Sequence, residues 1–383
     1  MSEDGARALL PPGFNDILPP DAAFEADIVG RLMARVRASG YEQVKPPVVE
    51  YEDTLLAGDG ASMTARTFRL MDPMSHRMLA VRADMTLQIA RIATTRLVHE
   101  ARPLRLCYAG QVLQVAGSQL RPERQFGQMG CELIGSDSPA ADAEIVSLAA
   151  ESLAAIGVAD ISVDLNLPPL VPAVAEAIGM SDAALARVRA ALDRKDAAAV
   201  AALGGKGAQV LGALLAAAGP ADDAFAALGR IDLPPSARAA VAGLEDVVKR
   251  VRESAPGVAL TIDPVENRGF EYHTGVSFSI FSRRSRNELG RGGRYRAGNG
   301  GRGEHATGFT LFMDTVLKAA APVPHPKRIY VPLGVAPAEA ARLRAEGWTT
   351  VAGLANAADA RAEAKRLACG HVFAEGRASP VAE

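Results

Sequence analysis

The stretch Arg105–Gly135 reads RLCYAGQVLQVAGSQLRPERQFGQMGCELIG and decides the fold. Residues 104–113 carry a β-rich apolar pattern, and residues 114–124 form a polar segment that contains glycine and proline. From residue 126 to residue 134 the side chains again alternate between apolar and polar. The pattern therefore predicts two long strands joined by a polar loop.

Two polar residues of the second strand mark a candidate site. Gln128 and Glu132 are four residues apart, so in a strand their side chains point to the same face. An amide and a carboxylate on a face otherwise poor in charge suggest a cationic, hydrogen-bonding ligand. An exposed sheet face with two solvated polar residues fits the same spacing, and both interpretations stay open here.

Composition places the chain among globular proteins. Its 383 residues are enough for two or three domains, and 49% hydrophobic with 22% charged residues is ordinary for a soluble protein. A net charge of −2 argues against bulk nucleic-acid binding. Three cysteines without a CxxC pair fit reduced thiols. The N-terminus lacks a secretory apolar core, and the most apolar run, 210–218, is too short to span a bilayer. We expect a cytoplasmic protein without a membrane segment.

Periodicity predicts the other elements. Helices are expected at 21–39, 87–99, 136–157, 170–178, 183–193, 197–203, 207–218, 236–252, 337–346 and 356–367. Strands are expected at 41–51 (interrupted by two prolines), 67–70, 78–82, 161–165, 258–263, 276–281, 304–311, 329–333, 349–351 and 371–373. In the helix 136–157 we place Asp142 on the outer face. Three parts follow: a core of residues 1–167 and 255–320, a helical insertion 168–254, and a small α/β domain 327–383.

Residues 283–303 are rich in glycine and arginine. Gly298, Gly300 and Gly303 match the dinucleotide-binding spacing literally, but no βαβ unit surrounds them, so we reject that reading. The composition favours a basic loop. Whether it serves as an anion-binding or partner surface is left open.

Three segments resemble one known family. Tyr108, Gly110, Phe126, Gln128, Gly130, Glu132 and Gly135 stand in the places of motif 2 of class II aminoacyl-tRNA synthetases, specifically of histidyl-tRNA synthetase. The segment 40–50 (GYEQVKPPVVE) resembles motif 1, and 268–275 (RGFEYHTG) resembles the histidine-specific signature. The resemblance covers nearly the whole chain. It implies an α+β fold: a class II synthetase-like antiparallel sheet flanked by helices, a helical insertion, and a truncated anticodon-binding-like α/β domain.

The same resemblance implies a histidine site. Its residues are Asp84, Thr86, Gln114, Gln128, Glu132, Arg268, Tyr272 and His273. Asp84, Thr86 and Gln128 would hold the ammonium group, Glu132 the imidazole, and Arg268 the carboxylate, with Gln114 as a further candidate for the carboxylate. Two departures from the family weaken the match. The acid Asp84 is one methylene shorter than the family's glutamate, and a histidine at 273 replaces a tyrosine of the imidazole wall.

Catalysis is not expected. The motif 2 and motif 3 arginines that neutralise ATP in the family are Gln114 and Thr315 here, and Phe312 replaces a glycine. Phosphoryl charge needs such cations, so the pocket should lack the positive charge that a triphosphate requires. We expect no catalytic residue, no cofactor and no metal.

This profile resembles the synthetase-like regulatory subunits of ATP phosphoribosyltransferase. Such a subunit would pair with a short-form catalytic subunit and sense L-histidine as the effector. It would dimerise through the motif 1-like segment and would not bind tRNA specifically. The alternatives are an active histidyl-tRNA synthetase and a scaffold that activates the catalytic subunit without binding histidine.

Overall fold

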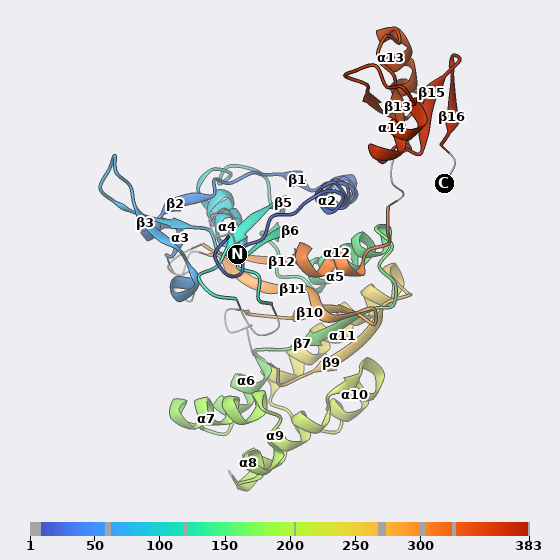
Figure 1. The fold of residues 1–383 in the computed structure, drawn as a ribbon. Coiled ribbons are helices and arrows are strands. Elements are labelled where there is room, and N and C mark those ends of the chain that lie inside the picture. Colours follow the sequence, from blue (N-terminus) through green and yellow to red (C-terminus); the bar gives the residue numbers. More distant parts are fainter. Residues whose placement is uncertain are drawn as a thin grey trace. The chain divides into compact units, whose positions relative to one another are not determined.

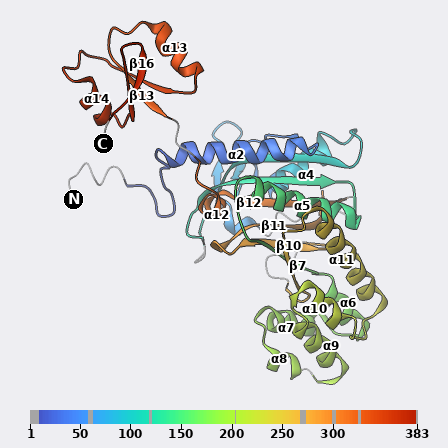
Figure 2. The same ribbon diagram turned by 90° about the vertical axis from the view of Figure 1, so that its right-hand side faces the viewer.

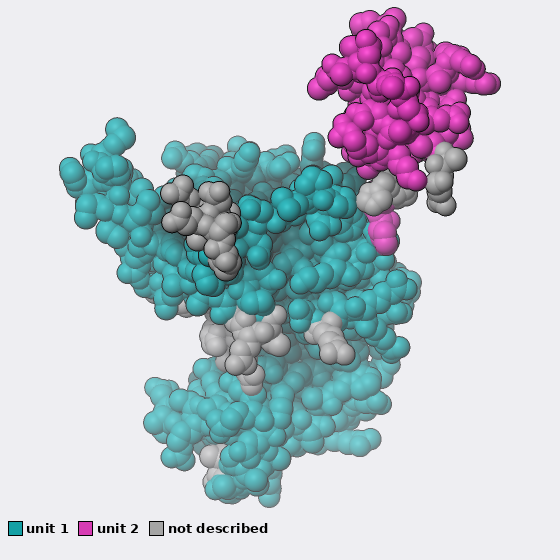
Figure 3. All heavy atoms as spheres, in the orientation of Figure 1, with its two compact units in different colours: residues 1–321 teal, residues 322–383 magenta. Residues whose placement is uncertain are grey.

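The computed structural model describes residues 9–57, 63–117, 121–202, 204–266, 273–298, 303–323 and 327–381. The chain divides into two compact units, residues 1–321 and residues 322–383 (Figure 3). Each unit has a sheet of its own (Figure 1). The candidate site lies in the first unit.

A nine-stranded sheet forms the centre of the first unit, in the order β1-β5-β6-β12-β11-β10-β7-β9-β8. Its strands are β1 (Glu42–Gln43), β5 (Leu104–Leu113), β6 (Gln125–Ile134), β7 (Ile161–Asn166), β8 (Gly219–Pro220), β9 (Ala259–Asp263), β10 (Ser277–Ser282), β11 (Ser285–Ala297) and β12 (Glu304–Phe312). From β5 to β7 all neighbours are antiparallel. This confirms the predicted antiparallel sheet and the two strands on either side of the polar loop.

Helices cover both faces of this sheet (Figure 2). They are α2 (Asp21–Ala38), α4 (Thr86–Thr95), α5 (Pro139–Ala155), α11 (Pro235–Ser254) and α12 (Met313–Ala319). Helix α4 packs on the face that carries Leu106, Tyr108 and Phe126. Helix α5 begins three residues later than predicted, because Ser138 caps it and Pro139 occupies its first position. Among the described helices, none is both long and apolar enough to cross a membrane.

The two prolines of the 41–51 segment separate two sheets. Strand β1 lies at the edge of the large sheet, whereas β2 (Val49–Tyr51) belongs to a three-stranded sheet in the order β2-β4-β3. Strands β3 (Arg69–Met71) and β4 (Met78–Val81) form the expected hairpin. Because proline cannot donate to a ladder, the chain changes sheets at this point.

The described residues of 168–254 are mostly helical, as predicted, with the short strand β8 among the helices. The helices here are α6 (Leu170–Ala177), α7 (Asp182–Asp193), α8 (Ala197–Ala201), α9 (Gly205–Ala216), α10 (Ala221–Leu228) and α11. Helix α10 was not predicted. Helix α11 buries the apolar side chains Leu244, Val247 and Val251.

The arginine- and glycine-rich stretch is mostly a strand, which corrects the expected loop. Strand β11 pairs with β10 on one side and β12 on the other. Its glycines allow close strand approach: a Cβ at Gly290 would come within 2.5 Å of the Thr310 carbonyl oxygen. Arg294 forms an ion pair of 2.6 Å with Asp142 of α5. Asp142 is only 2% exposed, so its predicted outward position is wrong.

The second unit is a small α/β structure. Parallel strands β13 (Arg328–Val331), β14 (Thr349–Ala352) and β15 (His371–Ala374) are joined by an antiparallel β16 (Arg377–Pro380), which was not predicted. Helices α13 (Pro337–Ala345) and α14 (Ala360–Arg366) complete it. Separate apolar clusters around Ile329 and Tyr330 form its core.

Candidate amino-acid-binding site

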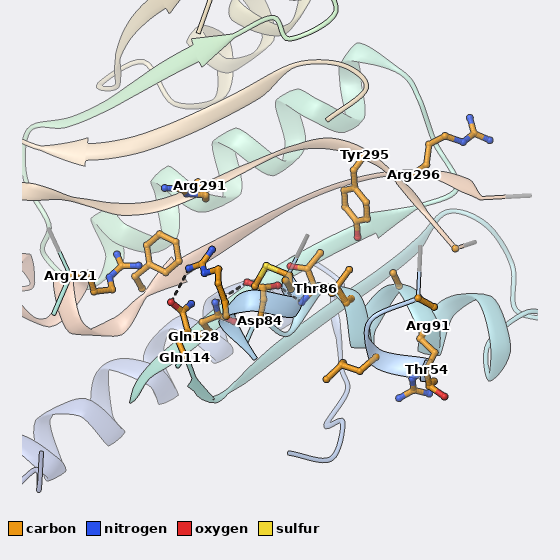
Figure 4. Close-up of a pocket in the computed structure, with 18 of the residues that line it drawn as sticks. Thr54, Asp84, Thr86, Arg91, Gln114, Arg121, Gln128, Arg291, Tyr295 and Arg296 are labelled. Carbon is orange, nitrogen blue, oxygen red and sulfur yellow. Dashed lines mark hydrogen bonds between the residues drawn. The ribbon is translucent and has the colours of Figure 1, made fainter. Parts of the chain in front are cut away.

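A cavity of about 1060 Å³ lies between α4 and the strands β6 and β11. This is slightly above the usual range for small-molecule sites, about 300–1,000 Å³. Four of the predicted site residues line it: Asp84, Thr86, Gln114 and Gln128. Figure 4 shows these four together, with Arg121 and Arg291 to one side and Tyr295 to the other.

Asp84 and Gln128 form the polar centre of the cavity. The Gln128 Nε2 atom donates to Asp84 Oδ2 at 2.9 Å, and its Oε1 accepts from the Met85 amide at 3.1 Å. The Thr86 amide donates to Asp84 Oδ1 at 2.8 Å, so the carboxylate also caps the first turn of α4. Asp84 therefore both holds the first turn of α4 and lines the cavity. The carboxylate is held in place where it can accept from a ligand ammonium group.

Glu132 is enclosed beneath this centre and is 1% exposed. The Tyr295 hydroxyl donates to Glu132 Oε2 at 2.9 Å, and the Tyr108 hydroxyl donates to Oε1 at 3.2 Å. Burial raises the pKa of Glu132 to about 8, against the lowering effect of the bond from Tyr295, and the charge of Asp84 raises it further. The carboxyl group is therefore protonated at neutral pH and can donate as well as accept.

The Tyr108 hydroxyl connects Glu132 to Thr86, whose backbone amide in turn donates to Asp84. The Tyr108 hydroxyl lies 3.2 Å from Thr86 Oγ1 and 2.9 Å from Thr310 Oγ1. Burial raises the pKa of Tyr108 far above its ordinary value, so its hydroxyl stays protonated. Through Tyr108, the carboxyl of Glu132 is coupled to the start of α4, where Asp84 is fixed.

Glycines at fixed points make room for this network. A Cβ at Gly308 of β12 would collide with the Glu132 carboxyl group. A Cβ at Gly130 would likewise collide with the Tyr108 hydroxyl. Both glycines are therefore required by the positions of the polar side chains opposite them.

The remaining predicted residues lie elsewhere or outside the described ranges. His273 is 7% exposed, and its ring packs against the backbone of β11, where a Cβ at Gly293 would come within 2.5 Å of it. Arg268 and Tyr272 fall outside the described residues. Their assignment to the carboxylate and the imidazole wall stays a prediction.

The cavity does carry positive charge, contrary to expectation. Its lining arginines are Arg66, Arg91, Arg121, Arg291 and Arg296. Three of them form ion pairs: Arg91 with Glu50 at 2.5 Å, Arg121 with Asp314 at 2.9 Å, and Arg291 with Glu288 at 2.5 Å. Much of this charge is thus compensated by the protein itself. None of the five was among the predicted site residues, although Arg291 and Arg296 lie in the stretch 283–303, whose role as an anion-binding surface was left open.

Thr315, which stands where the synthetases have an ATP-binding arginine, has a structural role here. Thr315 is 1% exposed and donates to the carbonyl oxygens of Glu288 and Phe312 at 2.8 and 3.0 Å. The Arg121 guanidinium lies over the Phe312 ring, 3.9 Å from its centroid, and 5.0 Å from that of Phe126. The aromatic surface at this end of the cavity is therefore covered by a cation.

Known proteins are similar to this chain in sequence and in fold. The family model described as histidyl-tRNA synthetase matches residues 13–316. An ATP phosphoribosyltransferase regulatory subunit of Rhodospirillum centenum is 57% identical, with coverage of 97% of this chain and 96% of the relative. Another from Rhodospirillum rubrum is 48% identical over 100% of this chain and 99% of the relative.

Among solved structures, one titled as an ATP phosphoribosyltransferase regulatory subunit/histidyl-tRNA synthetase from Bacillus halodurans has a TM-score of 0.81. It is 25% identical, with coverage of 94% of this chain and 96% of that one. These matches extend over both the sheet and the segments that build the cavity. The chain therefore belongs to the histidyl-tRNA synthetase-like family of ATP phosphoribosyltransferase regulatory subunits.

Proposed function

We propose that this chain is a non-catalytic subunit that senses histidine and adjusts the activity of a separate, short-form catalytic subunit of ATP phosphoribosyltransferase. The observation that carries the proposal is a contrast between the polar groups at the cavity and the positions that correspond to the ATP-binding arginines of the synthetases. The acceptors for an amino acid are fixed by hydrogen bonds around Asp84 and Glu132, whereas the phosphate-binding arginine positions hold Gln114 and Thr315.

Histidine would span the two acids. Its ammonium group would donate to Asp84 and to the oxygen atoms around Gln128 and Thr86, in a part of the cavity that is only partly exposed. Its imidazole would approach Glu132 and the hydroxyls of Tyr108 and Tyr295. Because Glu132 is protonated at neutral pH, it can donate to a neutral imidazole nitrogen or transfer its proton to form an ion pair.

Adenylation is disfavoured by two features together. The α- and γ-phosphates would lack the arginines of motifs 2 and 3, each of which would supply several kcal/mol to a charged transition state. The adenine ring of ATP would also meet Arg121, whose guanidinium covers the ring of Phe312. Arg91 and Arg291 are tied to carboxylates of the protein, so they do not replace the missing pair.

Feedback requires that histidine distinguish two states of the complex. An effector shifts an equilibrium only by its difference in affinity between the states, typically worth about 1–3 kcal/mol. The partner is proposed from the names of the relatives. A solved structure titled as the ATP phosphoribosyl transferase (HisG:HisZ) complex from Thermotoga maritima has a TM-score of 0.60 and 18% identity, which supports the fold. A homodimer through the motif 1-like segment is part of the same proposal.

Calorimetry with L-histidine tests the sensing role. We expect heat of binding from the isolated chain or from its complex with the catalytic subunit, and loss of that heat in Glu132→Ala. The absence of heat in both preparations would leave the scaffold alternative. Histidine-dependent ATP–pyrophosphate exchange by the isolated chain would instead establish the synthetase alternative.

A further inference from the structure

Arg66 lines the cavity and is held there by residues that are distant from it in sequence. It precedes β3, and its carbonyl oxygen accepts from the Val115 amide at 2.9 Å. Its Nη2 atom donates to Gln114 Oε1 at 2.8 Å, and Gln114 Nε2 donates to the Ala83 carbonyl oxygen at 3.3 Å. The guanidinium of Arg66 is therefore connected, through one amide, to the residue directly before Asp84.

Arg66 also differs from three of the other four arginines of the cavity in that its charge is not balanced by a neighbouring carboxylate. Within the described part of the chain, no carboxylate lies within ion-pair distance of it, and its side-chain partner is the neutral amide of Gln114. Arg91, Arg121 and Arg291 each have a carboxylate partner. The side chain is accessible from the open cavity, although surrounding protein removes part of its water.

The electrostatic setting favours an anion at this position. Desolvation lowers the pKa of Arg66, and the charges of Arg291 and Arg121 lower it further, whereas Asp84 acts in the opposite direction. A negative group bound here would therefore relieve repulsion among three guanidinium groups. A planar guanidinium can also bind a carboxylate through two parallel hydrogen bonds.

The geometry matches one class of ligand. In an α-amino acid the ammonium and the carboxylate are attached to the same carbon, so their protein partners must lie side by side. Asp84 is the acceptor for the first group, and Arg66 is the adjacent uncompensated donor for the second. Gln114, which stands where the synthetases have an arginine, joins the two.

We propose that Arg66, oriented by Gln114, binds the α-carboxylate of the amino acid in this cavity, so that only a ligand with both α-groups free is recognised. This rests on the proposed function, because it takes the ligand to be histidine. It moves the carboxylate contact from Arg268 to a residue of a different segment. Histidinol, in which a CH₂OH group replaces the carboxylate, should then bind weakly to the natural chain.

The test is calorimetry of the full chain, with and without its catalytic subunit, using L-histidine and L-histidinol. The variants are Arg66→Met, Arg66→Lys and the control Arg69→Met, whose side chain contacts Glu52 outside the cavity. Arg66→Met should weaken histidine binding by about 10- to 100-fold and leave histidinol binding unchanged. Arg66→Lys should have an intermediate affinity for histidine, because lysine keeps the positive charge but cannot make two parallel hydrogen bonds to the carboxylate. Arg69→Met should match the natural chain.

The other outcomes separate the two proposals. If the natural chain binds no histidine, the proposed function fails and the Arg66 assignment fails with it. If it binds histidine and Arg66→Met binds equally well, the Arg66 assignment alone is wrong. Equal weakening of histidine and histidinol would make Arg66 a structural residue and would also overturn it. If Arg66→Met does not fold, the ratio of histidine to histidinol affinity in Arg66→Lys decides: an unchanged ratio overturns the assignment.

Discussion

The Tyr295 hydroxyl donates a hydrogen bond of 2.9 Å to Oε2 of Glu132, and so connects β11 to β6 across the intervening strand β12. The Arg/Gly-rich composition around Tyr295 suggested a loop, yet the residue is 6% exposed in the middle of the sheet. The bond fixes a buried carboxyl group that has no ion-pair partner among the described residues. Several measurable properties depend on this arrangement.

Replacing Glu132 with glutamine should change the pH dependence of stability. The pKa of Glu132 is about 8 in the folded chain and near 4.5 when it is exposed by unfolding. Between these values the folded chain holds a proton that the unfolded chain has lost, so its unfolding free energy falls as pH rises from about 4.5 to about 8. Glu132→Gln removes this decline, which is on the order of a few kcal/mol. Urea unfolding at pH 5, 7 and 9 measures it.

Glu144 provides the matched control for that experiment. Its pKa is lowered by the hydrogen bond from Arg105, so it is ionised in both states above pH 5. Glu144→Gln should therefore leave the slope between pH 6 and pH 9 unchanged. A Glu132→Gln variant with the same slope as the natural chain would mean that the buried carboxyl group ionises normally.

Tyr295→Phe should weaken histidine binding without unfolding the chain. On the proposed function it removes a hydroxyl that the imidazole would approach, and one lost hydrogen bond to the ligand is worth about 1–2 kcal/mol, or roughly 5- to 30-fold in affinity. Calorimetry with L-histidine measures the change. Tyr330→Phe, in the core of the second unit, is the control and should bind histidine normally. Unchanged affinity in Tyr295→Phe would place the ligand away from Glu132.

Gly308→Ala should disrupt the site from the opposite strand. The added methyl group would collide with the Glu132 carboxyl group, and we expect a loss of about 1–3 kcal/mol in stability and loss of histidine binding. Gly243→Ala is the matched control, since a Cβ there meets open space on α11. It should be neutral or stabilising by up to about 1 kcal/mol. Thermal unfolding and calorimetry compare the two variants, and equal behaviour would contradict the described packing.

Arg294→Met should be among the more damaging substitutions away from the cavity. It leaves the Asp142 carboxylate, 2% exposed, without its cation, and breaking one side of a buried pair costs about 3–5 kcal/mol. The double variant Arg294→Met/Asp142→Leu should recover much of this loss, because it removes the uncompensated charge. Arg342→Met, on the exposed surface of α13, should change stability little. Failure of the double variant to recover would show that the pair holds the strand to α5 by more than charge.

Sequence predicted those parts of the fold that depend on local pattern. The alternation of apolar and polar residues predicted β5 with its observed bounds and β6 to within one residue. Apolar residues at every fourth position predicted α2. It failed for β11, because arginine and glycine are typical of loops, whereas here the glycines serve close strand approach. Arg66 and Arg121 were missed for a different reason. Each is positioned by contacts distant in sequence, with Val115 and with Asp314, which no local period can reveal.

The guanidinium that lies over the Phe312 ring has a consequence for any attempt to restore nucleotide binding in this cavity. Reinstating arginines at positions 114 and 315 would return charge for the phosphates but would leave an adenine ring without a free surface on which to stack. Aminoacyl-adenylate chemistry would also require the substitution of Arg121, which would remove the ion-pair partner of Asp314. On the proposed function, restoring a nucleotide site would therefore require substitutions at three positions at least, 114, 121 and 315, rather than at two.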